Sequence, residues 1–314
     1  PAPDVWVNGV NYNYNSVIFS YTNAEGYQEM ENNDFKAVSF DGETCEIVEY
    51  IGDGGEVVVP AKMTDTSRKE YTVTSVTASL FAYKSEITKV SFEEGTAITE
   101  LPASFLAFKT TDNSSGVADE TLVINLPATI KKFNDEAVRT YKTIGGITSG
   151  ENADIVDFTN AEEFAAQSMD CLGDTFKAKT LAFSGNLKSM AYSAFRASNI
   201  GTFLFKEGNY ENTEIGVKVE NRAPSSIGIV EFENGAANYN EMVDSLLTWN
   251  CVKKFVFDGA DGAKETYTVN YTDKTVTWVT TGTDITTAPT VGDTWHGFTV
   301  SAVEAEKEVT IGSW

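Results

Sequence analysis

Few side chains in this sequence are equipped for catalysis. The only histidine is His296, so a Ser–His–Asp or Cys–His site would have to use it. No Gly-x-Ser-x-Gly segment, which exposes a nucleophilic serine on a sharp turn, occurs in the chain. A metal site with two or three histidines is excluded by composition. Because His296 stands between Trp295 and Gly297, we interpret it as a turn residue beside a packed tryptophan.

Carboxylates are abundant, but abundance alone does not make a site. A glycoside hydrolase needs two acids about 5 to 9.5 Å apart across a cleft. Asp157 and Glu231 project from candidate strands, and nothing in the sequence brings them together. The segment from Asp258 to Gly262 looks like a calcium loop but lacks the terminal glutamate of an EF-hand, since position 269 is Val269. We interpret it as a turn and leave bound calcium open. With phosphate-binding loops also missing, we expect no enzyme and no cofactor.

The three cysteines, Cys45, Cys171 and Cys251, are widely spaced and form no Cys-x-x-Cys pair. A metal cluster is therefore not expected. Cys171 and Cys251 fit better as small core residues than as a disulfide. In an exported chain, the odd number leaves at least one thiol free.

Charge and hydropathy narrow the classes of partner. The chain has 314 residues and a formal net charge of −23, which disfavours binding to nucleic acid and to anionic lipid. We interpret the acidic exterior as a solvated surface. No apolar run reaches 18 residues, so no transmembrane helix and no direct membrane insertion is expected. The start at Pro1 carries no signal peptide, which suggests a trimmed, mature chain.

The elements that would hold any functional site are predicted by a repeated strand motif. Its form is apolar-x-x-apolar-x-apolar, often followed by x-x-Gly. It occurs about seven times, first at Ile87, Val90, Phe92 and Gly95. Its copies end at Phe92, Ile124, Phe158, Phe183, Phe205, Phe232 and Phe257. Spacings of 22 to 34 residues predict a solenoid, in which each unit buries its apolar face by stacking on its neighbours. We expect the phenylalanines to form an inward ladder. A generic β-rich fold with chance periodicity is the alternative.

In several units, a second apolar set follows the turn after the strand. In the first unit it consists of Ile98, Leu101 and Phe105; in a later unit Tyr239 and Met242 fall at near-helical spacing. Each unit thus predicts a strand, a turn and a short helical or irregular return. The fold class expected is an α/β repeat solenoid with β-rich caps at both ends.

Several of these units resemble the BspA-like leucine-rich repeats of bacterial surface proteins, of the type found in Bacteroides. The segments that carry the resemblance are 87–95 (ITKVSFEEG), 98–105 (ITELPASF) and 187–195 (LKSMAYSAF). It covers roughly residues 55–260. Phenylalanine often replaces the usual isoleucine or leucine, the cysteine common after Ala-Phe is missing, and a turn-rich insertion at 110–116 stretches one unit.

The resemblance implies a leucine-rich-repeat solenoid of strand–turn–short-helix units. It also implies an extracellular, secreted protein on a bacterial cell surface, often a lipoprotein whose lipid anchor would precede residue 1. Adhesion to a host or microbial protein is the function it implies.

Caps are expected at both ends because terminal units would otherwise expose their apolar faces. Residues 1–54 contain several candidate strands separated by turn signals and predict an N-terminal β cap. Residues 55–260 form the solenoid. Residues 261–314 contain a hairpin pattern and predict a C-terminal β cap or a small β domain.

The outward residues of the strands give a candidate surface for a partner. If the motif residues point inward, the residues between them point to solvent. The resulting apolar candidates for this partner-contact strip are Val123, Ile155, Leu204, Ile229 and Val256. A contiguous apolar patch usually marks an interface, so we expect a protein partner there. Burial under the C-terminal segment or an insertion is the alternative.

Two other functions stay open. The aromatic residues outside the periodic set, Trp6, Tyr12, Tyr14 and Tyr21, could stack on sugar, which would suit a carbohydrate-binding accessory protein of polysaccharide capture. Packing within the cap is the simpler explanation for them. A wholly polar strip would instead favour a structural surface spacer.

Overall fold

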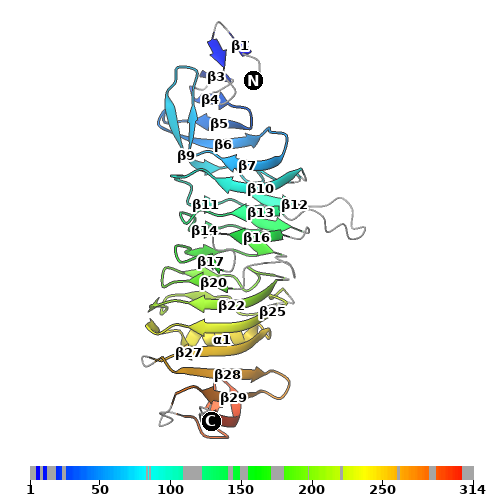
Figure 1. Ribbon diagram of the computed structural model, residues 1–314, viewed down its shortest axis with the longest axis vertical. Helices are drawn as coiled ribbons and strands as arrows, with labels where there is room; N and C mark the ends of the chain where they lie inside the picture. Colours follow the sequence, from blue (N-terminus) through cyan, green and yellow to red (C-terminus); the bar gives the residue numbers. More distant parts are fainter. Residues whose placement is uncertain are drawn as a thin grey trace, which may run out of the picture.

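The computed structural model shows an elongated stack of strands that run across the long axis (Figure 1). It describes residues 5–7, 10–12, 19–22, 26–82, 84, 86–108, 122–140, 144–148, 155–170, 180–196, 198–219, 222–259, 262–282 and 288–305. The chain forms a β-solenoid of about eight turns, as the repeat spacing predicts. No helix among these residues is long and apolar enough to cross a membrane.

Parallel strands, one per turn, build the main sheet face. The first segment contains β7 (Gly55–Val59), β10 (Ile87–Phe92), β13 (Leu122–Asn125) and β16 (Ile144–Thr148). The second contains β17 (Ile155–Asp157), β20 (Thr180–Phe183), β22 (Asn199–Phe205), β25 (Ser226–Phe232) and β27 (Val252–Asp258). In β22 and β25, which show it most clearly, burial alternates near the end of the strand and places every second side chain in the core.

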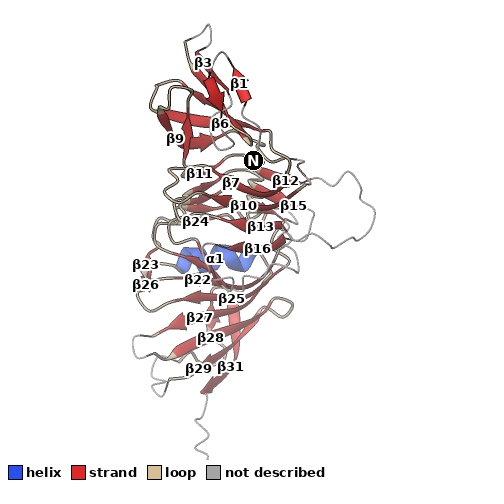
Figure 2. Cartoon of the chain, turned by 45° about the horizontal axis from the view of Figure 1, so that its top comes forward, coloured by secondary structure: helices blue, strands red, loops and turns tan. Residues whose placement is uncertain are grey.

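The returns between these strands differ from the expected helical ones. They stack as very short parallel strands: β11 (Glu100–Leu101), β14 (Lys132–Phe133), β18 (Glu163–Phe164), β21 (Ser189–Met190) and β24 (Glu214–Ile215), together with β12 (Leu106–Phe108), β15 (Val138–Thr140) and β19 (Met169–Asp170). A further pair joins β23 (Gly208–Asn209) to β26 (Ala236–Ala237). The described part of the chain has one helix, α1 (Asn240–Thr248), which is blue in Figure 2.

The prediction of a short helix in every unit is therefore wrong for the described units. Apolar residues three apart, such as Ile98 and Leu101, are also compatible with a tight corner followed by a two-residue strand. The corner is the structure adopted: Lys132 and Phe133 pair with Glu100 and Leu101 of the preceding turn. Among the units that the structure describes, only α1 realises the helical alternative, with Met242, Val243, Leu246 and Leu247 in the core.

The predicted phenylalanine ladder is present over five successive turns. Phe158, Phe183, Phe205, Phe232 and Phe257 stack with centroid separations of 5.9, 5.3, 5.0 and 5.5 Å. The first four are at most 4% exposed. Phe92 is partly buried and stacks on Phe105 at 6.1 Å, so it packs on the core without joining this run.

The unit around Ile124 differs from its prediction in register. Ile124 pairs with Val90, not with Phe92, so the predicted alignment is shifted by two residues. The long interval after Ile124 also contains a strand that the repeated motif does not predict. In that strand, β16, Ile147 pairs with Ile124. The sequence IGGIT of β16 has no alternating apolar triad, which explains the omission.

A separate, largely antiparallel sheet covers the N-terminal end. Its order is β3 (Phe19–Thr22), β4 (Gln28–Glu31), β5 (Phe35–Ser39), β6 (Thr44–Tyr50), β9 (Glu70–Val76) and β8 (Lys62–Thr64). Two of these strands follow β7 in sequence, so this sheet and the first solenoid turn are interleaved. The hydrophobic core is continuous between this sheet and the solenoid. Four aromatic rings connect the two, each 5.1 to 5.5 Å from the next between ring centroids: Phe35, Tyr50, Phe81 and Phe105. β1 (Val5–Val7) and β2 (Val10–Tyr12) form a hairpin.

The C-terminal segment continues the second part of the main sheet. β28 (Lys264–Asn270) pairs antiparallel with β27, and β29 (Thr275–Thr280), β31 (Phe298–Ala305) and β30 (Thr294–Trp295) follow. Trp278 is 1% exposed and Tyr267 stacks on Trp295 at 4.3 Å. These strands cover the edge that β27 would otherwise leave open, which is the role of a cap.

Candidate binding surface on the sheet

The register of the second sheet segment aligns most of the predicted strip. Leu204 pairs with Glu231, and Glu231 with Val256. A second row of paired residues crosses the same strands. It begins with Ile155 and continues through Thr180, Thr202 and Ile229 to Lys254. Val123 belongs to the first segment, where it pairs with Lys89. Four of the five candidates therefore lie on one continuous sheet.

The five candidates differ in how much of each side chain is exposed to solvent. Ile155 is 38% exposed, and Val123, Leu204 and Ile229 are partly buried. Val256 is only 7% exposed, so the expectation that it faces solvent is wrong. Ala182, which lies next to Leu204, is fully buried as well. The open part of the strip consists of Ile155, Leu204 and Ile229.

Lys264 reaches across the strand that carries Val256. Its ammonium, which belongs to β28, pairs with Glu231 of β25 and lies 3.2 Å from Asp258 Oδ1 of β27. The side chain therefore crosses β27 next to Val256. The hydrogen bond to Glu231 is the main cause that raises the lysine pKa. The C-terminal segment thus covers one end of the strip with an ion pair, which was the alternative considered for these residues.

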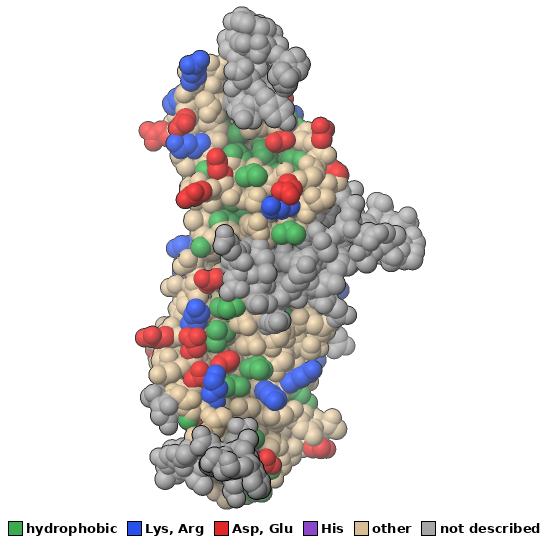
Figure 3. Space-filling view, viewed as in Figure 1, with side chains coloured by type: hydrophobic (Ala, Val, Ile, Leu, Met, Phe, Trp, Pro, Cys, Tyr) green, Lys and Arg blue, Asp and Glu red, His purple; other side chains and the backbone are tan. Residues whose placement is uncertain are grey.

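The rest of this face is mixed in character. Hydrophobic side chains are interspersed with charged ones on the face shown in Figure 3. The threonines Thr180 and Thr202 separate the apolar residues of the open strip and are partly exposed. The open strip thus combines apolar side chains with threonine hydroxyls.

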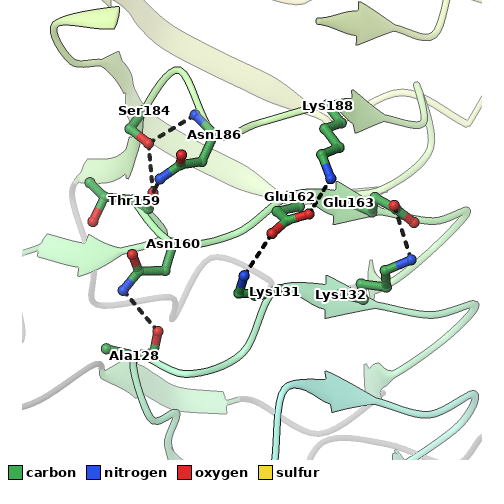
Figure 4. A network of polar contacts seen from close by, with 10 residues as sticks. All are labelled: Ala128, Lys131, Lys132, Thr159, Asn160, Glu162, Glu163, Ser184, Asn186 and Lys188. Atoms are coloured by element: carbon green, nitrogen blue, oxygen red, sulfur yellow. Dashed lines mark hydrogen bonds and ion pairs between the residues drawn. The ribbon is translucent and has the colours of Figure 1, made fainter.

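A polar network joins the turns at one corner of the solenoid (Figure 4). Asn160 and Asn186 each donate from Nδ2 to a carbonyl of the preceding turn, on Ala128 and Thr159, at 2.9 Å. Ser184 also donates to the Thr159 carbonyl, at 2.6 Å. Each turn thus satisfies backbone acceptors of its neighbour.

Glu162 lies between two lysines in the same network. Its carboxylate accepts hydrogen bonds from Lys188 and from Lys131, the latter at 2.9 Å. These bonds, with that of Lys188 first, lower the pKa of Glu162 to about 2. Lys132 and Glu163 form a parallel ion pair at 3.0 Å. These charges satisfy one another, so this corner serves to hold successive turns together.

His296 occupies a turn beside a packed tryptophan, as its sequence context predicts. The Trp295 ring lies 4.8 Å from the imidazole at an interplanar angle of 80°. Nδ1 of His296 lies 2.7 Å from Oδ1 of Asp244, which belongs to α1. The pair ties the β30–β31 connection to the helix.

The described cysteines behave as core residues. Cys45 is buried and Cys251 packs against the core, and both are free thiols. Burial raises the pKa of each thiol to about 12, which keeps it protonated and unreactive. Cys171 lies outside the described residues.

The calcium-like segment behaves as a turn at its described ends. Gly259 donates its N–H to Ala263, and the Asp258 carboxylate lies against Lys264. Within the ranges that the structure describes, no three His, Cys, Asp or Glu side chains gather in a way that could hold a metal ion.

Comparison of this chain with protein-family models, curated proteins and solved structures finds no match. The resemblance to BspA-like repeats therefore rests on the quoted segments alone.

The N-terminal sheet carries a second surface, which the sequence patterns do not predict. A groove of about 380 Å³ there is lined by Glu29, Met30, Glu31, Lys36, Ala37, Val38 and Val48. Phe40, in the turn after β5, is 75% exposed. A phenylalanine directly before Asp41-Gly42 was the available signal, because turn positions are normally polar. The side chains of Trp6, Tyr12, Tyr14 and Tyr21 lie outside the described residues.

Proposed function

We propose that this chain is a non-enzymatic binding module of the BspA-like type, which presents the outer face of its sheet to a protein partner at a bacterial cell surface. The observation that carries the proposal is the open strip. Ile155, Leu204 and Ile229 lie on adjacent or nearly adjacent strands of one sheet and keep part of their apolar surface in water. Apolar groups arranged in this way on a rigid scaffold gain free energy when a partner covers them.

Rigidity supports the same proposal. The strands that carry the strip are fixed from behind by the phenylalanine ladder and from the side by the corner network. A surface that is already ordered loses little conformational entropy on binding, so more of the contact energy contributes to affinity.

The location is part of the proposal. A formal charge of −23 keeps such a protein soluble and away from anionic lipid and nucleic acid. Export and attachment through a lipid anchor come from the resemblance alone. A spacer that holds another domain away from the cell is the second candidate, favoured by the elongated stack of turns in Figure 1.

The test is a site-directed photocrosslink from the strip. A photoreactive amino acid at position 204 should capture a defined partner from host-matrix or bacterial-surface extracts, and the same residue at position 219 should not. Val219 is a suitable control because it is 77% exposed on a loop outside the strip.

Substitution then tests the contact with the identified partner. The double variant Ile155→Asp with Leu204→Asp should lose binding, and Val219→Asp should retain it. Equal binding by all variants would refute the strip as the interface. A glycan array on the same protein separates the carbohydrate alternative, and a failure to capture anything would favour the spacer.

A further inference from the structure

The turn between β5 and β6 presents an exposed phenylalanine, which contacts a partly buried tyrosine that directly precedes β4. Phe40 is 75% exposed, and the Tyr27 ring lies 5.0 Å from it at 49°. The register of β4 and β5, in which Gln28 pairs with Ser39, brings Tyr27 opposite Phe40. Folding does not remove this phenylalanine from water, so its position is not explained by the core.

The turn that carries Phe40 is held in one conformation. Oδ1 of Asp41 accepts backbone N–H groups of Glu43 at 2.8 Å and Thr44 at 2.7 Å, and Oδ2 accepts the Thr44 hydroxyl at 2.6 Å. These bonds, with that of the Thr44 hydroxyl first, lower the pKa of Asp41. Gly42 has φ of +78°, which favours glycine at that place. The aromatic side chain is thus displayed on an ordered support.

An apolar floor continues from the aromatic pair across the sheet. Val38 and Val48 line the groove of about 380 Å³ on this face, and Val48 is 37% exposed. Ala37, which also lines the groove, is 1% exposed, and its pairing partner Ile47 is fully buried, so the groove has a packed base.

The groove is bordered by negative charge. Strands β4, β5 and β6 carry four glutamates, Glu29, Glu31, Glu46 and Glu49, against one lysine, Lys36. Lys36 is already engaged, since its ammonium lies 2.7 Å from Glu49 Oε2. That hydrogen bond, assisted by Glu31 and Glu29, raises the lysine pKa. An excess of carboxylate therefore surrounds an apolar floor and an aromatic pair.

We propose that this face of the N-terminal sheet docks a basic, partly apolar segment of another protein. Arginine or lysine side chains of the segment would lie over the Phe40 and Tyr27 rings and meet the glutamates, and its apolar side chains would cover Val38 and Val48. A second copy of this chain is disfavoured as the occupant because each copy carries a charge of −23. The surface lies outside the strip on the solenoid, so this proposal does not depend on the proposed function.

The test uses the full chain and three labelled peptides in fluorescence anisotropy. The probe alternates arginine and valine; one comparison peptide alternates arginine and serine, and the other alternates glutamine and valine. The first should bind more tightly than both others, with an affinity that falls as salt is raised. Phe40→Ala should weaken it by about ten-fold, as for an exposed anchor residue. Glu29→Gln with Glu31→Gln should weaken it several-fold.

Matched controls separate this site from general attraction to an acidic protein. Glu211→Gln with Glu214→Gln removes the same charge from an exposed corner of the solenoid, and Val219→Ala removes an equally exposed apolar group. Both should bind the probe as the unaltered chain does. Unchanged binding by Phe40→Ala, or an equal loss in the Glu211–Glu214 variant, would overturn the proposal. So would binding of a glycan at Phe40 without binding of the arginine–valine peptide.

Discussion

The phenylalanine ladder gives the sharpest test of how this solenoid is stabilised. Phe183 is fully buried and lies in the middle of the run. Its ring contacts five other phenylalanine rings, at centroid separations of 5.3 to 6.4 Å. Substitution to alanine leaves a cavity and removes all five ring contacts. Phenylalanine-to-alanine changes in cores cost about 3–5 kcal/mol, and we expect Phe183→Ala to reach about 5 kcal/mol because aromatic pairs add to the burial of area.

Phe92 provides a matched control within the same chain. It is the equivalent residue of an earlier repeat, but it is only partly buried and has one stacked partner, Phe105, at 6.1 Å. We expect Phe92→Ala to cost about 1–2 kcal/mol, since roughly half of the side-chain transfer energy is at stake. Urea unfolding of the three proteins measures both values as shifts of the midpoint.

Hydrogen exchange shows which strands are destabilised by Phe183→Ala. In a solenoid each turn contacts mainly its neighbours, so Phe183→Ala should lower protection in β17, β20 and β22 far more than in the N-terminal sheet. Equal costs for Phe183→Ala and Phe92→Ala would refute the ladder as a main source of stability. A uniform loss of protection along the chain would refute the turn-by-turn description.

Three other outcomes follow from the structure. Val256→Asp should cost about 3 kcal/mol in urea unfolding, because it buries a third carboxylate beside Glu231 and Asp258, which already share Lys264. Ile155→Asp should cost less than about 1 kcal/mol. Glu162→Gln should lower the free energy of unfolding at neutral pH. The difference from the unaltered chain should disappear as the pH falls from about 4.5 towards about 2, because a carboxyl group with a lowered pKa stabilises the fold only while it is ionised. A difference in unfolding free energy that does not change with pH would contradict this. Gly228→Ala should destabilise by about 1–3 kcal/mol, measured as a lower melting temperature, because its Cβ would lie 2.7 Å from the Gly201 carbonyl oxygen.

The sequence contains enough information to predict the solenoid, because stacked turns require apolar side chains at equivalent places. Phe158 to Phe257 show this most clearly, since one aromatic side chain per turn must meet the next. The sequence determines the pairing register of neighbouring strands less well than it determines the fold. In Leu122-Val-Ile-Asn-Leu126 every second residue is apolar, so the alternation fits two alignments with β10 equally well, and only the pairing of Ile124 with Val90 decides.

The sequence predicts which face of a strand a side chain lies on better than it predicts how exposed that side chain is. Alternation predicts Val256 on the outer face of its strand, but the side chain is only 7% exposed where Lys264, from another strand, reaches across to Glu231. Such long-range covering leaves no local pattern. The aromatic pair of the N-terminal sheet was missed for the opposite reason: an apolar residue such as Phe40 is normally assigned to the core, and only the structure shows it in water.

The direction of the inter-turn hydrogen bonds has a mechanical consequence. The strands run across the long axis in Figure 1, so the bonds between successive turns point along it. A force that pulls the two ends apart would load these bonds one ladder after another instead of shearing many at once. The molecule should then lengthen in small steps at low force, each step releasing one turn of about 22 to 34 residues, the repeat spacing of the sequence. A protein built in this way would yield gradually under tension and could reform turn by turn when the tension is removed.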